Sequence, residues 1–556
     1  MLSFVPSDRQ YISWEWKCKE TNNTIIGSSN MINPLKEKLL VSDEINNDGT
    51  IYLLSPYRSK KDIPGILVLS GQTYGRYKNK LLYKCIPNDK YLPCFLIPYE
   101  NKKTSFNKNL VNKYVLFKFS EWTSKHPIGT LNNILGNVDI PENFYNYQLY
   151  CKDLFNIGLK EIPTKWLKEV TKESFIDDIL AKSNIEDRTS NNIFSIDPED
   201  CQDYDDALGI IEIDGGYILS IYISNVAIYI ESLDLWDKII DKIATIYLPD
   251  KKISMLPKIL SENLCSLQEK KRRFALALDI TVINNEIVNY NFNNVIIKLD
   301  KNYIYDESEL LLNSDYLTIL NLTKHLNNSK SYLQYINNSH DLVEYYMILM
   351  NHIASQNLCK FKNGIYRSVT GIMDNKYDNL SQEVKQFMKM WKGTSGKYTN
   401  FNNKEGHNLI SDGLDSYLHI TSPIRRIVDL INIIIIQQNN NLYNFGHACN
   451  NFVNQSMEKL NDINIIMKKI KQVQNDCLLL SKYINNTINK DIIYEGYIIE
   501  KEKEKNEYTV YISKIKFVTK IKLLEELELY NKYKFTIHLL TDENTLKKKI
   551  RLQVKF

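Results

Sequence analysis

A cluster of acidic residues between apolar stretches is the feature that most constrains how this chain folds. Six of the ten residues from Asp197 to Asp206 are acidic, and largely apolar stretches lie on both sides, at 193–196 and 207–213. A turn at 214–216 and a third such stretch, ending at Val226, follow. Apolar runs bounded by turn residues predict strands, so we expect the acids on a loop that is anchored in a sheet. The six acids are Asp197, Glu199, Asp200, Asp203, Asp205 and Asp206.

This crowding of carboxylates requires compensation. Two like charges about 4 Å apart repel by about 4 kcal/mol at an effective dielectric constant near 20. A folded site holds them with a cation or by protonation, and hard divalent ions bind oxygen ligands. Two such ions, held by several carboxylates, suit the hydrolysis of a phosphodiester. An exposed acidic turn and a calcium loop are the alternatives, although the EF-hand pattern fails because Leu208 stands where it requires glycine.

A second segment provides a candidate cation for a phosphate. Ser422 suits a helix N-cap and a proline follows it, so the pattern predicts a helix over 423–437. Arg425 and Arg426 would then lie in the first turn, where the helix dipole disfavours positive charge. That position suits an anionic ligand, because free N–H groups and guanidinium groups point the same way. The alternative is a simple Arg425–Asp429 ion pair within the helix.

The rest of the chain has β-rich ends and a mixed middle. Short β runs separated by glycine and proline fill the first ~170 residues and return over the last ~65, which is typical of small barrels. Helical periodicity appears at 339–360 and 455–485. Aromatic and basic residues interleave at 57–78, which suits either a surface for single-stranded nucleic acid or a solvated β surface.

Composition restricts location and partners. The chain has 70 Lys and Arg against 66 Asp and Glu, a net charge of only +4, so any basic binding surface is local. The nine cysteines show no zinc-binding spacing, and we expect reduced thiols in the cytoplasm, that of the host if the source is a virus. No apolar run approaches the ~20 residues that span a bilayer, so we expect no membrane contact. We also expect a monomer.

Together the two segments resemble the RNB catalytic domain of the ribonuclease II / ribonuclease R family, to which the exosome's exonuclease is also similar. The family's acidic signature, Ile-Asp-Pro-x-Asp-x-x-Asp-x-Asp-Asp-Ala, appears without a gap at 196–207. Its Thr-Ser-Pro-Ile-Arg-Arg segment appears at 421–426, and 339–347 resembles its Ser-His-x-Leu-Val-Glu-x-x-Met helix. The resemblance runs from near residue 100 to the C-terminus, and it implies a 3′-to-5′ exoribonuclease that releases nucleoside 5′-monophosphates from single-stranded RNA.

The resemblance also implies roles for individual residues. Four aspartates would hold Mg²⁺, with Mn²⁺ as the other possible ion, and orient the attacking water: Asp197, Asp203, Asp205 and Asp206. Arg425 would contact the scissile phosphate, with Arg426 beside it on the RNA. Tyr247 and Tyr305 would flank the terminal nucleotide, and Glu344 would lie near its ribose.

The implied architecture is multidomain α+β, with OB-fold β-barrels flanking a mixed α/β RNB catalytic domain. We expect a cold-shock/OB-like RNA-binding region at 1–170, the RNB domain at 171–485 and an S1-like OB domain at 486–556. We expect no endonuclease domain before the barrels. OB-type barrels bind single strands by stacking and backbone contact, which makes single-stranded RNA the expected partner.

Three departures from the family pattern support a second hypothesis. Asn225 stands where the family has an acid beside the site, Asn432 lies near the place of a histidine, and Gln474 replaces a glutamate. These changes leave the four aspartates and Arg425 in place. The alternative to an active enzyme is therefore a catalytically inactive RNB-fold protein that binds RNA.

Overall fold

The computed structural model describes residues 2–18, 24–26, 33–46, 50–59, 62–100, 110–155, 173–239, 242–329, 332–368, 384, 396–402, 416–485, 488, 492–502, 506–515, 517–523, 525–541 and 548–555. The chain divides into two compact units. The central unit comprises Ile157–Tyr247 and Lys251–Lys471. The terminal unit comprises Met1–Asn156, Leu248–Asp250 and Gln472–Phe556.

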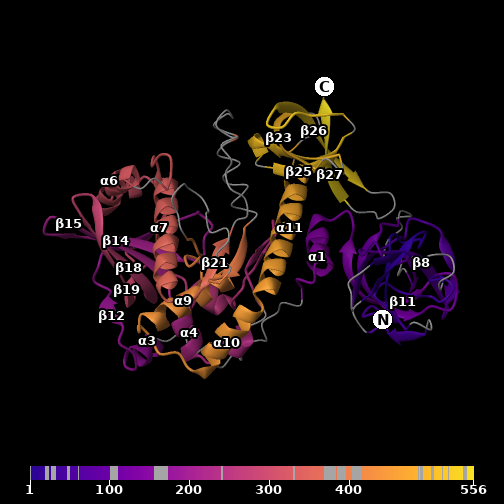
Figure 1. Cartoon of the computed structure of the whole chain (residues 1–556), viewed down its shortest axis with the longest axis horizontal. Coiled ribbons are helices and arrows are strands. Elements are labelled where there is room, and N and C mark those ends of the chain that lie inside the picture. The colour runs from indigo at the N-terminus through magenta and orange to yellow at the C-terminus, as the bar shows by residue number, and fades with distance from the viewer. Residues whose placement is uncertain are drawn as a thin grey trace. The chain divides into compact units, whose positions relative to one another are not determined.

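A seven-stranded sheet is the framework of the central unit (Figure 1). Neighbouring strands are antiparallel except at the two edges, where β12 pairs with β19 and β13 with β20 in parallel. Helices pack on apolar residues of this sheet. Burial by these helices accounts for the nearly continuous apolar sequences of its middle strands. In spatial order the strands are β12 (Glu186–Arg188), β19 (Glu286–Lys298), β18 (Arg272–Ile283), β15 (Gly216–Ser224), β14 (Asp206–Ile213), β13 (Ile193–Asp197) and β20 (Lys301–Ile304).

Two long helices of the central unit carry segments identified in the sequence. Helix α7 (Ser339–Lys360) begins after Asn338, whose side chain accepts the backbone N–H of Asp341 at 2.9 Å. Helix α9 (Ile427–Asn439) is apolar on almost all sides, and nearly every residue in it is buried. The other helices are α3 (Glu173–Leu180), α4 (Val226–Ser232), α5 (Trp236–Ile239), α6 (Ser314–Ser329), α10 (His447–Glu458) and α11 (Leu460–Ile484), which continues into the terminal unit.

Two small hairpins and a π-helical turn complete the central unit. The first hairpin pairs β16 (Ile246–Tyr247) with β17 (Lys252–Ile253), and the turn η1 (Leu260–Leu264) follows it. The second pairs β21 (Ile365–Ser368) with β22 (Lys397–Asn400). The first hairpin brings two side chains to the acidic loop, as described below.

Two sheets with a shared hydrophobic core form the N-terminal part of the terminal unit. In the second sheet, β6 pairs with both β10 and β8, so five of its strands close into a ring, as in an OB-type barrel. Helix α1 (Pro141–Cys151) follows this ring. The first sheet has the order β3 (Thr24–Ile26), β2 (Trp14–Cys18), β1 (Leu2–Pro6), β4 (Glu44–Ile45), β5 (Ile51–Leu53), and the second β6 (Ile63–Leu67), β10 (Lys113–Glu121), β11 (Ile128–Asn137), β9 (Phe95–Tyr99), β8 (Lys80–Pro87), β7 (Thr73–Tyr77).

The C-terminal residues form a five-stranded antiparallel sheet with its own apolar core. Its two middle strands β23 and β24 are buried over most of their length, including Tyr494 and Tyr508. The spatial order is β25 (Phe517–Lys522), β24 (Glu507–Ile512), β23 (Tyr494–Glu502), β26 (Lys532–Thr541) and β27 (Lys548–Lys555).

This architecture confirms the predicted fold class, a mixed α/β framework accompanied by β-barrel sheets. The β interpretation of the first ~170 residues was wrong at α1, because Phe144 and Tyr147, three positions apart on one helical face, both pack their rings against Tyr114 of the neighbouring sheet. The domain limit predicted at 170/171 lies outside the described residues, so the three-domain division stays a prediction. Among the helices in the described ranges, none is long and apolar enough to cross a bilayer.

Candidate active site

The acidic residues lie on the hairpin between β13 and β14, as their position between two apolar runs predicted. Asp197 ends β13 and Asp206 begins β14. Ser266 holds the connecting loop at two points: its hydroxyl accepts the N–H of Tyr204 at 3.0 Å and donates to the carbonyl of Gln202 at 2.8 Å. Glu199 and Asp200 are exposed, but the end of the loop that carries Asp203, Asp205 and Asp206 is fixed to the framework, which argues against a wholly exposed acidic turn.

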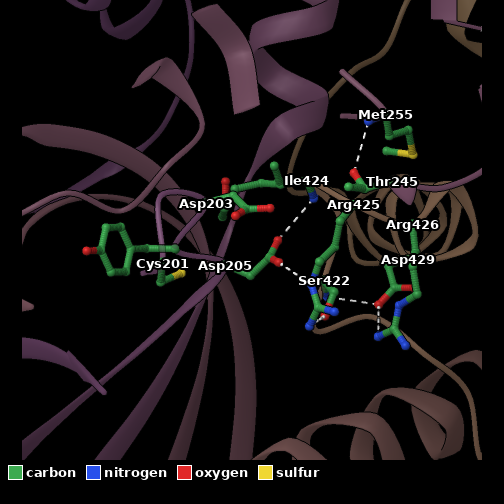
Figure 2. Close-up of polar contacts among 12 residues, drawn as sticks. Cys201, Asp203, Asp205, Thr245, Met255, Ser422, Ile424, Arg425, Arg426 and Asp429 are labelled. Carbon is green, nitrogen blue, oxygen red and sulfur yellow. Dashed lines mark hydrogen bonds and ion pairs between the residues drawn. The ribbon is translucent and has the colours of Figure 1, made fainter. Parts of the chain in front are cut away.

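Asp205 joins the acidic hairpin to the arginine segment (Figure 2). Its Oδ2 accepts Nε of Arg425 at 3.0 Å, and its Oδ1 accepts the backbone N–H of Ile424, also at 3.0 Å. The Asp205 side chain is only 4% exposed, whereas that of Arg425 is 43% exposed. Burial raises the pKa of Asp205 to about 7, although Arg425 and the Ile424 N–H act in the opposite direction. The ion pair thus presents a partly exposed guanidinium at the end of a buried carboxylate.

Asp197 and Asp206 add two further carboxyl groups to the same end of the hairpin. Burial raises the pKa of Asp197 to about 6, and it raises the pKa of Asp206 well above its ordinary value, with Asp197 and Asp205 adding to the effect. Within the described residues, Oδ2 of Asp197 is buried and has no hydrogen-bond partner. A desolvated carboxylate oxygen without a donor is costly, so this atom is suited to a cation.

Asp203, the fourth predicted aspartate, is bound by the β16–β17 hairpin. Its Oδ2 accepts the hydroxyl of Tyr247 at 3.3 Å, and its Oδ1 accepts Nζ of Lys252 at 3.1 Å. The same Nζ lies 3.2 Å from Oε1 of Glu262 in η1. Burial disfavours the charge of Lys252, but hydrogen bonds with Asp203 and Glu262 raise its pKa overall. Tyr247 was predicted to be part of the site, whereas Lys252 was not.

Backbone pairing places Arg425 beside the hairpins. Thr245 donates its N–H to the carbonyl of Arg425 at 3.0 Å, and Ile427 donates its N–H to the carbonyl of Ile243 at 2.9 Å. Ala244 and Arg426 form the bridge between these two bonds. Since β16 begins directly after this pairing, Tyr247 and Arg425 are carried to the same acidic loop.

The helix predicted over 423–437 begins later than expected. Helix α9 starts at Ile427, and the preceding Arg426 is extended, with φ −138° and ψ 125°. The reason is that Oδ1 of Asp429 accepts the N–H of Ser422 at 2.8 Å, which folds 422–426 into a turn before the helix. Arg425 and Arg426 therefore precede the first helical turn, and Ser422 is not its N-cap.

Arg426 makes a different contact from its neighbour. Its Nη2 donates to Oδ1 of Asp429 at 2.8 Å, and the Asp429 side chain is fully buried (Figure 2). The ion pair considered from the sequence therefore forms with Arg426, whereas Arg425 pairs with Asp205. Binding of RNA by Arg426 stays a prediction.

Tyr305 lies next to the acids and is stacked on a residue that the sequence did not single out. Its N–H donates to the carbonyl of Asp197 at 3.2 Å. Its ring lies parallel to that of His340, with centroids 3.6 Å apart and an interplanar angle of 10°. The hydroxyl of Ser339 donates to Asp306 at 2.8 Å, and this fixes the start of α7 to the residue after Tyr305. The Ser339-His340 pair in the α7 motif was the available signal.

Glu344 is exposed on α7, one helical turn after His340. Its role at the ribose stays a prediction. Among the described residues, no three His, Cys, Asp or Glu side chains already surround one point as ligands of a single ion. The structure thus assembles the four aspartates, Arg425, Tyr247 and Tyr305 in one region through a linked set of contacts.

Comparison with known proteins connects this site to a family. The family model for the RNB domain matches residues 185–330, which include the four aspartates, Tyr247 and Tyr305. Ribonuclease R of Thermotoga maritima is 28% identical over 203 residues, which are 35% of this chain and 28% of that protein. The match thus spans less than a third of that relative.

Solved structures share the fold over a greater length. RNase R of Mycoplasma genitalium in complex with ribose-methylated single-stranded RNA has a TM-score of 0.67 and 16% identity, and the alignment covers 100% of both chains. Yeast Ssd1, a pseudonuclease, has a TM-score of 0.59 and 15% identity over 87% of this chain and 68% of that one. At these identities the likeness concerns the fold. The acidic hairpin lies within residues 185–330, which match the RNB domain, and the fold around it is similar to that of RNase R.

Proposed function

We propose that this protein is a metal-dependent 3′-to-5′ exoribonuclease that hydrolyses single-stranded RNA to nucleoside 5′-monophosphates. The observation that carries the proposal is the Asp205–Arg425 ion pair, which holds a partly exposed guanidinium at the edge of four clustered aspartates. Anionic phosphate and developing negative charge both favour such a guanidinium. A phosphodiester is therefore the substrate class that fits the charges of the site.

The carboxyl groups have the chemistry of ligands for a hard divalent cation. The buried Oδ2 of Asp197 is available within the described part of the chain, and the raised pKa values of Asp197 and Asp205 express a desolvation cost that a cation offsets. We assign Mg²⁺ to Asp197, Asp203, Asp205 and Asp206, and Mn²⁺ suits the same oxygen ligands. A bound ion would supply an activated water and neutralise charge on the phosphate.

The protein's own groups would orient the RNA end. Arg425 is held through Nε by Asp205 and through Nη2 by Ser422 at 2.8 Å, so its guanidinium plane is fixed before a phosphate binds. Tyr247 is 41% exposed, and with Tyr305 it would flank the terminal base. Glu344 is proposed to bind the ribose, where contact with a 2′-hydroxyl distinguishes RNA from DNA.

A catalytically inactive RNA-binding protein is the second candidate, and Asn225 is the observation that favours it. Its buried side chain donates to Asn294 and Gln437, at 3.0 Å each, and so belongs to an amide network and supplies no carboxylate. The likeness to the fold of a pseudonuclease is compatible with this candidate. The intact set of four aspartates with Arg425 favours the active enzyme.

The direction of attack and the product test the proposal together. Single-stranded RNA labelled at the 3′ end should release labelled nucleoside 5′-monophosphate from the first time point, whereas RNA labelled at the 5′ end should shorten in steps. Single-stranded DNA of the same sequence serves as the control and should persist. Tight RNA binding without any shortening would establish the inactive candidate. Action as a monomer in the cytoplasm stays a sequence-based prediction.

A further inference from the structure

Lys252 forms an ion pair with Asp203, one of the four carboxylates assigned to the metal. Its Nζ lies 3.1 Å from Oδ1 of Asp203, while the Tyr247 hydroxyl donates to Oδ2 of the same carboxylate at 3.3 Å. Both oxygens of Asp203 therefore accept hydrogen bonds from one hairpin. The Lys252 and Asp203 side chains are 21% and 11% exposed, so solvent screens their attraction only partly.

The hairpin fixes this arrangement. Tyr247 and Lys252 are register partners across β16 and β17, so their side chains lie on the same face of the hairpin. The Thr245 hydroxyl accepts the N–H of Met255 at 2.9 Å, which ties the two ends of the hairpin together (Figure 2). The contact between Lys252 and Asp203 is thus built into the backbone and is not a chance meeting of two long side chains.

Lys252 also has a second anionic partner. Oε1 of Glu262 lies 3.2 Å from the same Nζ, on the short turn η1 rather than on the acidic loop. An ammonium group shared between two carboxylates can leave one of them and remain paired with the other. A metal ion at Asp203 and an ammonium group hydrogen-bonded to the same oxygen would repel each other, because both are cations at close range.

We propose that Lys252 is an internal counter-ion that competes with the divalent metal for Asp203 and retreats to Glu262 when the metal binds. It is a positioning residue that sets the metal affinity of the site. This inference rests on the proposed function, because it requires Asp203 to be a metal ligand. In the metal-free protein, Lys252 compensates the charge of Asp203 and fixes its orientation, as Arg425 does for Asp205, so fewer acids of the loop are left without a cation.

Binding of Mn²⁺ alone tests the proposal without RNA or turnover, with the free ion measured by electron paramagnetic resonance. Lys252→Met should lower the dissociation constant about five- to tenfold, as expected for removal of one competing, partly buried ion pair. Glu262→Gln should raise it, because Lys252 then has no second partner. Lys252→Arg should stay close to wild type, since it retains the charge.

A double variant separates direct competition from a general effect of charge. Lys252→Met with Glu262→Gln has the net charge of the wild type, yet it should still bind Mn²⁺ more tightly, because nothing competes for Asp203. Lys251→Met is the matched control, with the same charge change at an exposed neighbouring position, and should alter binding less than about twofold. Lys252→Gln replaces the Met variant in every comparison if the latter does not fold.

Two results would overturn the inference. One is a double variant that binds Mn²⁺ like the wild type, and the other is a Lys252→Met effect equal to that of Lys251→Met. Either result leaves the proposed exoribonuclease intact as long as the wild type binds the metal. A wild-type protein that binds no Mn²⁺ would instead contradict the metal-dependent function itself, together with this inference.

Discussion

Nε of Arg425 donates to Oδ2 of Asp205 at 3.0 Å, although 220 positions separate the two residues in the chain. The contact joins the acidic hairpin to the turn before α9, the two segments that the sequence identified independently. The Asp205 carboxylate is buried, whereas the guanidinium of Arg425 is partly exposed. The ion pair therefore fixes the orientation of the guanidinium and leaves it accessible to solvent. In the proposed function, Asp205 would therefore couple substrate positioning to metal binding.

Replacement of Asp205 by asparagine should abolish cleavage and retain RNA binding. The amide keeps the size and one acceptor but loses the charge that holds Arg425 and a metal, so we expect turnover to fall at least about 100-fold. Cleavage of labelled RNA and a gel shift measure the two effects.

The control for this variant is Asp214→Asn, an identical charge change at the exposed turn between β14 and β15. It should cleave RNA like the wild type. Equal cleavage by the wild type and by Asp205→Asn would show that the site is wrongly assigned.

Arg425→Lys should reduce turnover more than RNA affinity. The guanidinium reaches Asp205 through Nε and Ser422 through Nη2, whereas a single ammonium group cannot span both while facing a phosphate. We expect a fall of about 10- to 100-fold in kcat, with a change of less than about threefold in the dissociation constant for RNA. Single-turnover kinetics with saturating enzyme separate the two quantities. A loss confined to affinity would argue for a role in binding alone.

His340→Ala should weaken capture of the RNA end. His340 stacks on Tyr305 with the ring centroids 3.6 Å apart. An aromatic pair contributes about 1 kcal/mol beyond its buried area. If this energy holds Tyr305 in position for the RNA end, its loss should raise the dissociation constant for RNA roughly fivefold. His340→Phe keeps the stack and should restore affinity. Fluorescence anisotropy of a labelled RNA in EDTA, where no cleavage interferes, makes the measurement. Identical affinities for all three proteins would exclude a role for the stack.

Without metal, the acidic cluster should make folding stability fall as pH rises. The folded pKa of Asp197 is raised to about 6, so the native state holds a proton that the unfolded chain releases near pH 4. This contribution to stability is complete below the unfolded pKa and is lost as pH rises through the folded one. In EDTA, the free energy of unfolding of Asp197→Asn should therefore rise relative to that of the wild type by roughly 1 to 2 kcal/mol between pH 4.5 and 7.5.

Urea unfolding of both proteins at a series of pH values gives this difference directly. Adding Mg²⁺ should stabilise the wild type at neutral pH and shrink the advantage of the variant. A difference between wild type and variant that does not change with pH would contradict the inferred burial of Asp197.

Local patterns predicted most of the framework. Helix α7 spans the residues that periodicity indicated, 339–360, because its apolar repeat and the Asn338 cap are both local signals. The acidic loop between two strands was likewise visible in the alternation of apolar and acidic runs. In both places the residues that define the element are neighbours in sequence.

What the sequence did not reveal depends on distant partners. The start of α9 was predicted too early, because the distant Ala244 pairs with the extended Arg426 and so adds to the local Asp429–Ser422 hydrogen bond that delays the helix. Lys252 was missed because its partner Asp203 lies 49 positions away, and no local pattern marks a lysine that will meet a carboxylate. His340 belongs to the motif at 339–347, but only the folded chain stacks it on Tyr305.

The most direct test of the central claim is metal-dependent shortening of RNA by the purified protein. A 5′-labelled single-stranded RNA is incubated with Mg²⁺ or with EDTA, and the products are separated on a denaturing gel. The account predicts stepwise shortening with Mg²⁺ and intact RNA with EDTA. Intact RNA under both conditions, from a protein that shifts the same RNA on a native gel, would contradict it.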